Sequence, residues 1–86
     1  MEILFSRKFK KEYKSFPDNI QKIIDSKLKI FTGNPFHPSL RVKKIKAKED
    51  IFECSINMNI RMTWCYHEKK VLLRAIGEHD KTLKNP

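Results

Sequence analysis

Side chains that can transfer a proton near neutral pH are scarce in this sequence. They are three histidines, His37, His67 and His79, because the imidazole ring ordinarily titrates close to cellular pH. Arginine and lysine are abundant, and a guanidinium group presents a planar fork of donors that matches the oxygens of a phosphate. These residue types together suit proton transfer beside a phosphate group.

Other common kinds of catalytic site find no support in the sequence. The histidines and the two cysteines, Cys54 and Cys65, are scattered without the close paired spacing that a zinc site requires. The sequence has no glycine-rich phosphate loop and no G-x-S-x-G motif. We therefore expect neither a metal ion nor a cofactor.

The charge balance points to a negatively charged partner. Nineteen Lys and Arg residues against ten Asp and Glu give a net charge of +9 in a chain of 86 residues, which favours binding to RNA, DNA, an anionic membrane or an acidic protein. Charged residues interrupt every apolar run, so no segment reaches the roughly 20 apolar residues of a membrane span. The first residues lack the features of a signal peptide. We expect one cytoplasmic domain over residues 1–86.

The first half of the chain has the spacing of a short strand followed by two helices. Residues 2–5 predict the strand, and Ser6 is a suitable N-cap for a helix that Pro17 ends. Asp18, with a glutamine three residues later, resembles the capping box of a second helix that stops at Gly33. Each helix has one apolar stripe, and the two stripes need a common surface to cover.

The second half alternates apolar and polar residues with the period of β-strands. We expect one strand that begins at Leu40, followed by a turn over Lys46–Asp50. Alternation over 51–58 and 60–66 predicts two strands of one hairpin with residues 57–59 as the connection, and 71–76 predicts a last strand that ends at Gly77. We expect a frayed tail from Asp80 to Pro86.

Matching apolar residues across the two middle strands requires a hairpin centred on Met58. This register sets Ser55 opposite Arg61 and Glu53 opposite Thr63 on a polar face that points away from the helices. It also places the two cysteines on opposite faces, which predicts free thiols in a reducing compartment.

The order of these elements resembles the RelE/ParE toxin superfamily over nearly the whole chain. The most telling pieces are the loop from Asn34-Pro35 to Leu40, Arg61 near the start of its strand, and the sequence Gly77-Glu78-His79-Asp80, which looks most similar to the YafQ-like branch. The resemblance implies an α+β fold in which a short N-terminal strand and an αα-hairpin pack on one face of a curved antiparallel sheet.

The resemblance also implies a function. Members of this superfamily are toxins of type II toxin–antitoxin systems, and most cleave messenger RNA in the A site of the 70S ribosome. The expected partners are therefore a cognate antitoxin, messenger RNA and the ribosome. The reaction needs no metal ion, because the 2′-hydroxyl of the RNA is the nucleophile and the protein moves protons and stabilises the charged phosphorane.

Four residues receive possible catalytic roles from the resemblance. His79 matches the terminal catalytic histidine, as general acid or base, and Arg61 matches the arginine that binds the scissile phosphate. Glu53 is a candidate for a second proton-transfer group, and Asp80 for a group that orients His79. The alternatives are a surface histidine on a frayed tail, a cross-strand salt bridge for Arg61, and two solvated surface acids.

Other residues receive weaker assignments. Candidate contacts to the RNA backbone, each of which is otherwise a solvated charge, are Arg41, Lys43, Lys44, Lys46 and Arg74. We expect Trp64 and Tyr66 to pack in the core rather than stack on bases, because they fall on the same face of their strand as its apolar residues. His37 and His67 have no matching catalytic counterpart and are expected to be structural or exposed.

Two further functions stay open. ParE-type relatives with this fold poison DNA gyrase, so a fold alone does not determine the target. A non-catalytic module that binds an acidic or amphipathic antitoxin segment is the third possibility.

Overall fold

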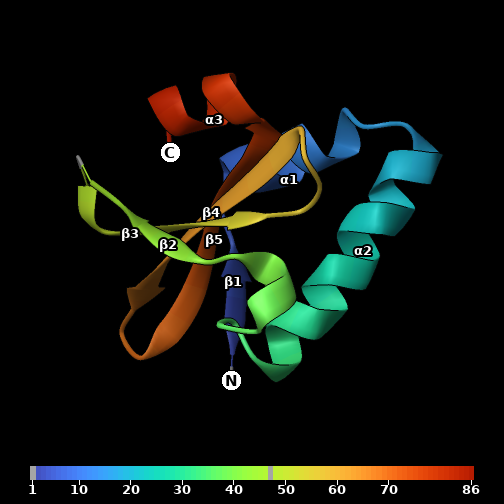
Figure 1. Cartoon of the computed structure of the whole chain (residues 1–86). Coiled ribbons are helices and arrows are strands. Elements are labelled where there is room, and N and C mark those ends of the chain that lie inside the picture. Colours follow the sequence, from blue (N-terminus) through green and yellow to red (C-terminus); the bar gives the residue numbers. More distant parts are fainter. Residues whose placement is uncertain (1, 47) are drawn as a thin grey trace.

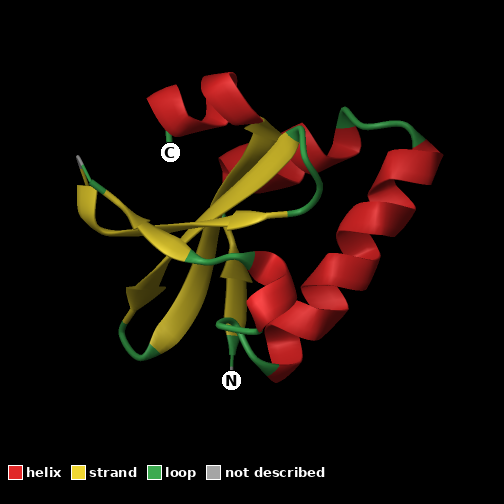
Figure 2. Ribbon diagram, viewed as in Figure 1, coloured by secondary structure: helices red, strands yellow, loops and turns green. Residues whose placement is uncertain are grey.

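The computed structural model describes residues 2–46 and 48–86, which form a twisted five-stranded sheet with helices against it (Figures 1 and 2). In chain order the elements are β1 (Ile3–Phe5), α1 (Arg7–Lys14), α2 (Asp18–Gly33), the 3-10 turn η1 (Pro38–Leu40), β2 (Lys43–Ile45), β3 (Lys48–Ser55), β4 (Ile60–His67), β5 (Lys70–Glu78) and α3 (His79–Lys84). No helix among these is long and apolar enough to cross a membrane. The expected α+β class is confirmed.

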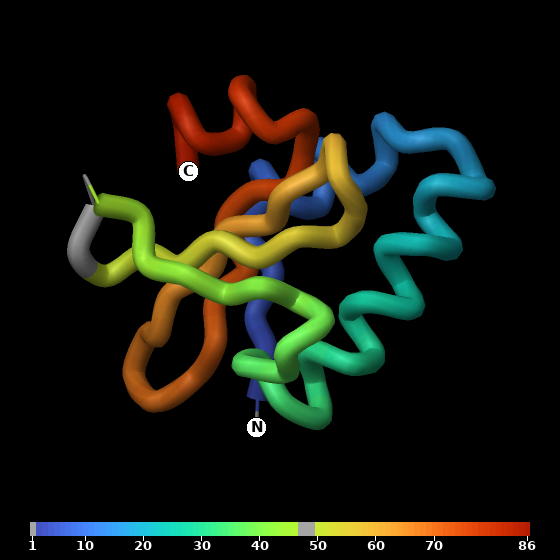
Figure 3. The backbone as a smooth tube through the Cα atoms, viewed as in Figure 1, coloured from blue at the N-terminus to red at the C-terminus, as the bar shows by residue number. Residues whose placement is uncertain are grey.

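The sheet is mixed rather than wholly antiparallel. Its strand order is β1-β5-β4-β3-β2. The four strands from β2 to β5 pair antiparallel, as expected, but β1 lies parallel to β5, with Ile3 beside Val71. The tube view shows the N-terminal strand beside the strand that enters α3 (Figure 3).

The helices lie on both faces of the sheet. Phe9 of α1 and Phe31 of α2 join the core cluster that contains Trp64. The side chain of Thr63 points to the opposite face, and its hydroxyl donates to the Pro86 carbonyl oxygen just beyond α3, at 2.9 Å. Helices α1 and α2 therefore cover one face as expected, and α3 covers part of the other.

The helix ends differ in part from the expectation. Ser6 is the N-cap of α1, and its hydroxyl oxygen accepts from the backbone N–H of Phe9 at 2.9 Å. The predicted capping box of α2 is wrong, because Pro17 stands at the N-cap and Asp18 is already the first helical residue, with no side-chain cap bond. The Gln21 amide instead donates to two backbone carbonyls at the end of α1, at 3.2 and 3.0 Å, which fixes the corner between the helices.

The core forms between α2 and the middle of the sheet. The rings of Trp64 and Phe31 meet edge to face, with centroids 5.3 Å apart. Cys54 is fully buried here, and burial, followed by the negative charge of Glu53, raises the pKa of its thiol to about 12. The expected core position is confirmed for Trp64 but is wrong for Tyr66, which is 54% exposed at the edge of the cluster.

The strand predicted from Leu40 is wrong. Residues 38–40 form the 3-10 turn η1, Arg41 follows in a left-handed conformation (φ 49°), and β2 starts at Lys43. The local chemistry of the turn outweighs the alternation of residues, because Pro38 fits a helical start and the His37 ring nitrogen Nδ1 accepts from the Ser39 N–H at 3.1 Å.

The turn predicted over Lys46–Asp50 is too long. Strand β3 already begins at Lys48, and Ala47 lies outside the described residues. The register centred on Met58 is confirmed, since Ser55 pairs with Arg61. The connection between the strands is longer than expected, however, and Met58 is 89% exposed instead of following the apolar face.

The end predicted at Gly77 and the frayed tail are both wrong. Strand β5 continues through Gly77 to Glu78, and α3 follows directly. The Glu78 carboxylate caps this helix by accepting from the N–H groups of Asp80 and Lys81, each at 3.2 Å. Thr82 is 2% exposed against the sheet. Capping and burial on the sheet thus order a segment that local composition marks as loose.

Candidate functional site

A small cavity of about 190 Å³ opens on the face of the sheet that carries α3. Strand β3 supplies two of its lining residues, and β2, β4 and α3 supply one each. The sixth lies between η1 and β2. The lining consists of Arg41, Lys43, Glu53, Ser55, Arg61 and His79. All of these residues except Ser55 are candidate site residues that were predicted from the sequence.

Arg61, the second residue of β4, lines the cavity and lies opposite Ser55. Its Nη1 donates to the backbone carbonyl oxygens of Asn57 at 2.7 Å and Met58 at 3.2 Å. In the described part of the chain its partners are thus backbone carbonyls and not an acidic side chain. A guanidinium group has five N–H donors, so this anchoring leaves capacity to bind a phosphate.

His79 enters the cavity from the first residue of α3. Its backbone N–H donates to the Asn59 carbonyl oxygen at 2.8 Å, and its Nδ1 lies 2.9 Å from Oδ1 of Asp80. A carboxylate on Nδ1 fixes the ring and leaves Nε2 as the nitrogen that is available for proton transfer. Asp80 itself is strongly exposed and does not line the cavity.

The connection between β3 and β4 holds Arg61 by its side chain and His79 by its backbone. Arg61 bonds to its carbonyl groups at Asn57 and Met58, and His79 bonds to Asn59. The Asn57 side-chain oxygen accepts from the N–H groups of Asn59 and Ile60, each at 2.8 Å, which fixes the shape of the connection. The sequence did not predict this role for Asn57, although asparagine is a common turn residue.

A solvated surface position for Glu53, the alternative to a catalytic role, is wrong. It is 6% exposed, and its Oε1 lies 3.8 Å from Nζ of Lys43. Arg41 and Arg61 line the same cavity. A carboxylate removed from water needs such opposite charges nearby, so the cavity combines one shielded acid with several cations.

The five candidate RNA contacts do not form one surface. Arg41 and Lys43 line the cavity, but Lys44 points to the other face of the sheet, with Nζ 5.8 Å from the centre of the Phe52 ring. Lys46 lies near Lys44 at the outer edge of the sheet.

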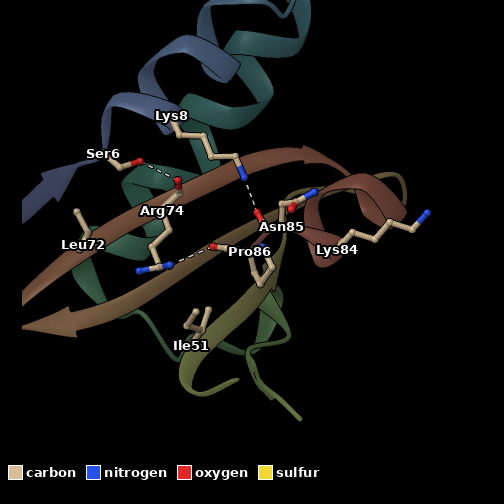
Figure 4. Close-up of a pocket in the computed structure, with 8 residues that line it drawn as sticks. All are labelled: Ser6, Lys8, Ile51, Leu72, Arg74, Lys84, Asn85 and Pro86. Carbon is tan, nitrogen blue, oxygen red and sulfur yellow. Dashed lines mark hydrogen bonds between the residues drawn. The ribbon is translucent and has the colours of Figure 1, made fainter. Parts of the chain in front are cut away.

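Arg74 belongs to a third place, shown in Figure 4. Its Nε donates to the Pro86 carbonyl oxygen at 3.1 Å, and its Nη1 lies 3.9 Å from Sγ of Cys65. Lys8 of α1 donates to the Asn85 carbonyl oxygen. These contacts hold the segment after α3 against the sheet and form the wall of a cavity of about 450 Å³. Arg74 thus has a structural partner and lies apart from His79.

The remaining histidines are separate from the site. His37 caps η1, and His67 is exposed at the end of β4. Among the described residues no group of three or more His, Cys, Asp or Glu side chains is arranged to hold a metal ion. The cavity therefore offers two proton-transfer groups, His79 and Glu53, beside three cations.

The fold has close counterparts among solved structures, although no protein-family model and no curated protein matches the sequence. A chain of the RelB–RelE antitoxin–toxin complex from Methanococcus jannaschii is 20% identical, with a TM-score of 0.75 over 96% of this chain and 99% of that one. YoeB from the Staphylococcus aureus dimer is 21% identical, with a TM-score of 0.74 over 92% and 97%. YafQ from Escherichia coli strain BL21(DE3) is 10% identical, with a TM-score of 0.78 over 94% and 96%.

These similarities span nearly the full length of each chain. This chain therefore has the RelE-like toxin fold, and the resemblance to the RelE/ParE superfamily is confirmed at the level of the fold.

Proposed function

We propose that this chain is the toxin of a type II toxin–antitoxin system and cleaves messenger RNA in the A site of the 70S ribosome. The observation that carries this proposal is the cavity in which His79, Glu53 and Arg61 meet. It supplies a proton-transfer pair next to phosphate-binding groups, which is what RNA cleavage without a metal ion requires. The ribosomal target implies a cytoplasmic protein.

The proposed reaction begins with attack of the substrate's 2′-hydroxyl oxygen on the adjacent phosphorus. Glu53 or His79 takes the hydroxyl proton as the new P–O bond forms, and the other group protonates the departing 5′-oxygen as the old P–O bond breaks. The products are a 2′,3′-cyclic phosphate and a 5′-hydroxyl end, so atoms and charges balance. Arg61, with Arg41 and Lys43, stabilises the negative charge of the phosphorane.

The proposed protein partner is an antitoxin with acidic residues. The net charge of +9 favours an acidic partner, and the RelB–RelE structure with this fold contains an antitoxin.

The first test is induced expression followed by primer extension on a reporter message. The protein is compared with His79→Ala and Arg61→Lys, and the matched controls are His67→Ala and Arg7→Lys, which change exposed residues outside the cavity. We expect cuts within translated codons, a loss of roughly 10²–10⁴-fold in cutting for His79→Ala, and cutting at the original rate in both controls.

Each other outcome points to one of the alternatives. Growth arrest without cuts, retained by His79→Ala, would replace the proposal with gyrase poisoning. Expression that causes no growth arrest in any host would replace the proposal with a non-catalytic module that binds an antitoxin. Thermal unfolding of each variant checks that lost cutting is not lost folding.

A further inference from the structure

A second cavity, of about 350 Å³, adjoins the first on the side of α2. Figure 1 shows the β3–β4 connection, in yellow, curving toward this helix. The two cavities share Arg41, Ser55 and Arg61, and the second adds Lys27 of α2, Ser39 of η1 and Met58 of the connection. Its volume falls at the lower end of the range for small-molecule pockets, so it fits a group the size of a nucleoside.

The charges of the second cavity favour an anionic occupant. Lys27, Arg41 and Arg61 line it, and no acidic residue does so among the described residues. Lys27 is partly buried rather than fully solvated. Three cations with no carboxylate between them repel one another, and a phosphodiester on the shared arginines relieves that repulsion.

Arg41 stands between the two cavities in a strained conformation. Its φ of 49° and ψ of 51° lie in the left-handed region, which costs a residue with a Cβ atom free energy. Residues held in this way gather at functional sites. The turn η1 therefore places this guanidinium where both cavities reach it.

Met58 stands at the rim of the second cavity with 89% of its surface exposed. Single exposed apolar side chains are common, but the backbone beneath this one is fixed by Asn57 and Arg61. A thioether side chain adapts well to an aromatic ring, and a nucleobase is such a ring. Its position beside three cations matches a nucleotide, whose base and phosphate are joined.

We propose that the second cavity binds the nucleoside next to the scissile phosphate of single-stranded RNA. Arg41 and Arg61 contact the phosphodiester between the two cavities, Lys27 contacts the following phosphate, and Met58 lies against the base. The Ser39 hydroxyl, whose oxygen lies 2.9 Å from Nδ1 of His37, also lines the cavity. It accepts a hydrogen bond from the base edge and contributes to base preference. This inference rests on the proposed function, because it extends the same substrate beyond the first cavity.

The test is a titration followed by the backbone amide signals of the ¹⁵N-labelled protein. The probe is a single-stranded RNA trinucleotide with 2′-O-methyl sugars, which blocks every nucleophile and prevents cleavage. We expect the signals of Ser39 and Met58 to shift together with those of Ser55 and His79. Adenosine monophosphate, with one base and one phosphate, is expected to shift fewer of them.

Two variants and one control measure how much Lys27 and Met58 contribute to the affinity for the trinucleotide. Lys27→Gln should lower the dependence of log affinity on log salt by about 0.7, the contribution of one phosphate on a single strand. Lys29→Gln, at an exposed position of the same helix outside the cavity, should leave it unchanged. Met58→Ser should weaken binding by roughly two- to tenfold, as expected for one sulfur–aromatic contact.

The outcomes separate this inference from the proposed function. Shifts confined to Glu53 and His79, or equal affinities for the Lys27 and Lys29 variants, would overturn the second cavity alone. No shifts in either cavity while ribosomes are still cut would also overturn it and leave the nuclease standing. No shifts and no ribosomal cuts would overturn both.

Discussion

Gly77 lies directly beneath Thr82, so closely that a Cβ atom on the glycine would stand 2.7 Å from the threonine Oγ1. Thr82 is a buried residue of α3. Gly77 lies near the end of β5 and pairs with Arg61 of β4. The missing side chain is what lets α3 rest on the sheet, and α3 begins with His79.

Gly77→Ala should therefore lower the free energy of unfolding by about 1–3 kcal/mol, the usual cost of overpacking. It should also slow RNA cutting by at least roughly tenfold, because a displaced α3 moves His79. Gly33→Ala is the control, since nothing lies within 4 Å of its added methyl group and alanine favours a helix by about 0.5–1 kcal/mol. Urea unfolding measures the free energy of unfolding of both variants. Equal values for Gly77→Ala and Gly33→Ala would contradict the close approach of Gly77 and Thr82.

Asp80→Asn tests the contact between this carboxylate and the ring of His79. The pair is exposed, so its loss should cost no more than about 1 kcal/mol, which slows cutting by about two- to fivefold. The melting temperature should stay that of the original protein. Asp50→Asn, at an exposed acid outside the cavity, serves as control. A loss of cutting as large as that of His79→Ala would instead make Asp80 an essential group.

Arg41→Asn tests whether the left-handed residue serves binding rather than folding. Asparagine tolerates this conformation better than arginine, so the free energy of unfolding should stay the same or rise by up to about 1 kcal/mol. Cutting should fall by roughly 10- to 100-fold, because a phosphate contact is lost. Arg7→Asn on α1 is the matched control. A destabilised protein with unchanged cutting would refute this division of roles.

Cys54 gives the stability of the protein a dependence on alkaline pH. The pKa of its thiol is about 12 in the folded chain and 9.0 ordinarily, so the unfolded state ionises first. The stabilisation is fully present below about pH 9 and is lost as the pH rises toward about 12.

Urea unfolding at about pH 8 and about pH 11 should show a larger loss for the original protein than for Cys54→Ala. The other titrating groups are common to both chains and cancel in the comparison. Equal losses would show that the buried thiol does not carry the effect.

The sheet and part of the site were predictable because their signals are local and periodic. Alternating residues on β3 and β4 fix which side chains share a face, so the pairing of Ser55 with Arg61 follows from the hairpin centre. The same parity puts Glu53 on that face. The positions of Arg61 and Glu53 around one cavity were thus within reach of the sequence.

The features that sequence analysis missed depend on contacts between distant segments. The ordered α3 requires the space above Gly77 and the bond from Thr63 to Pro86, which no local pattern reveals. The bond from His79 to Asn59 likewise joins the first residue of α3 to the β3–β4 connection, two segments that are far apart in the chain. The false strand at Leu40 came from alternation that one left-handed residue interrupts.

Strand β5 lies between β1 and β4 in the sheet, although the ribosome synthesises it after both. While residues 70–78 are still inside the exit tunnel, β1 has no strand to pair with and β4 has one bare edge. The segment that carries His79 emerges later still. Long-range pairing of this kind delays folding until the distant segment is made. A nascent copy therefore contains no assembled cavity until the segment that carries His79 has left the exit tunnel.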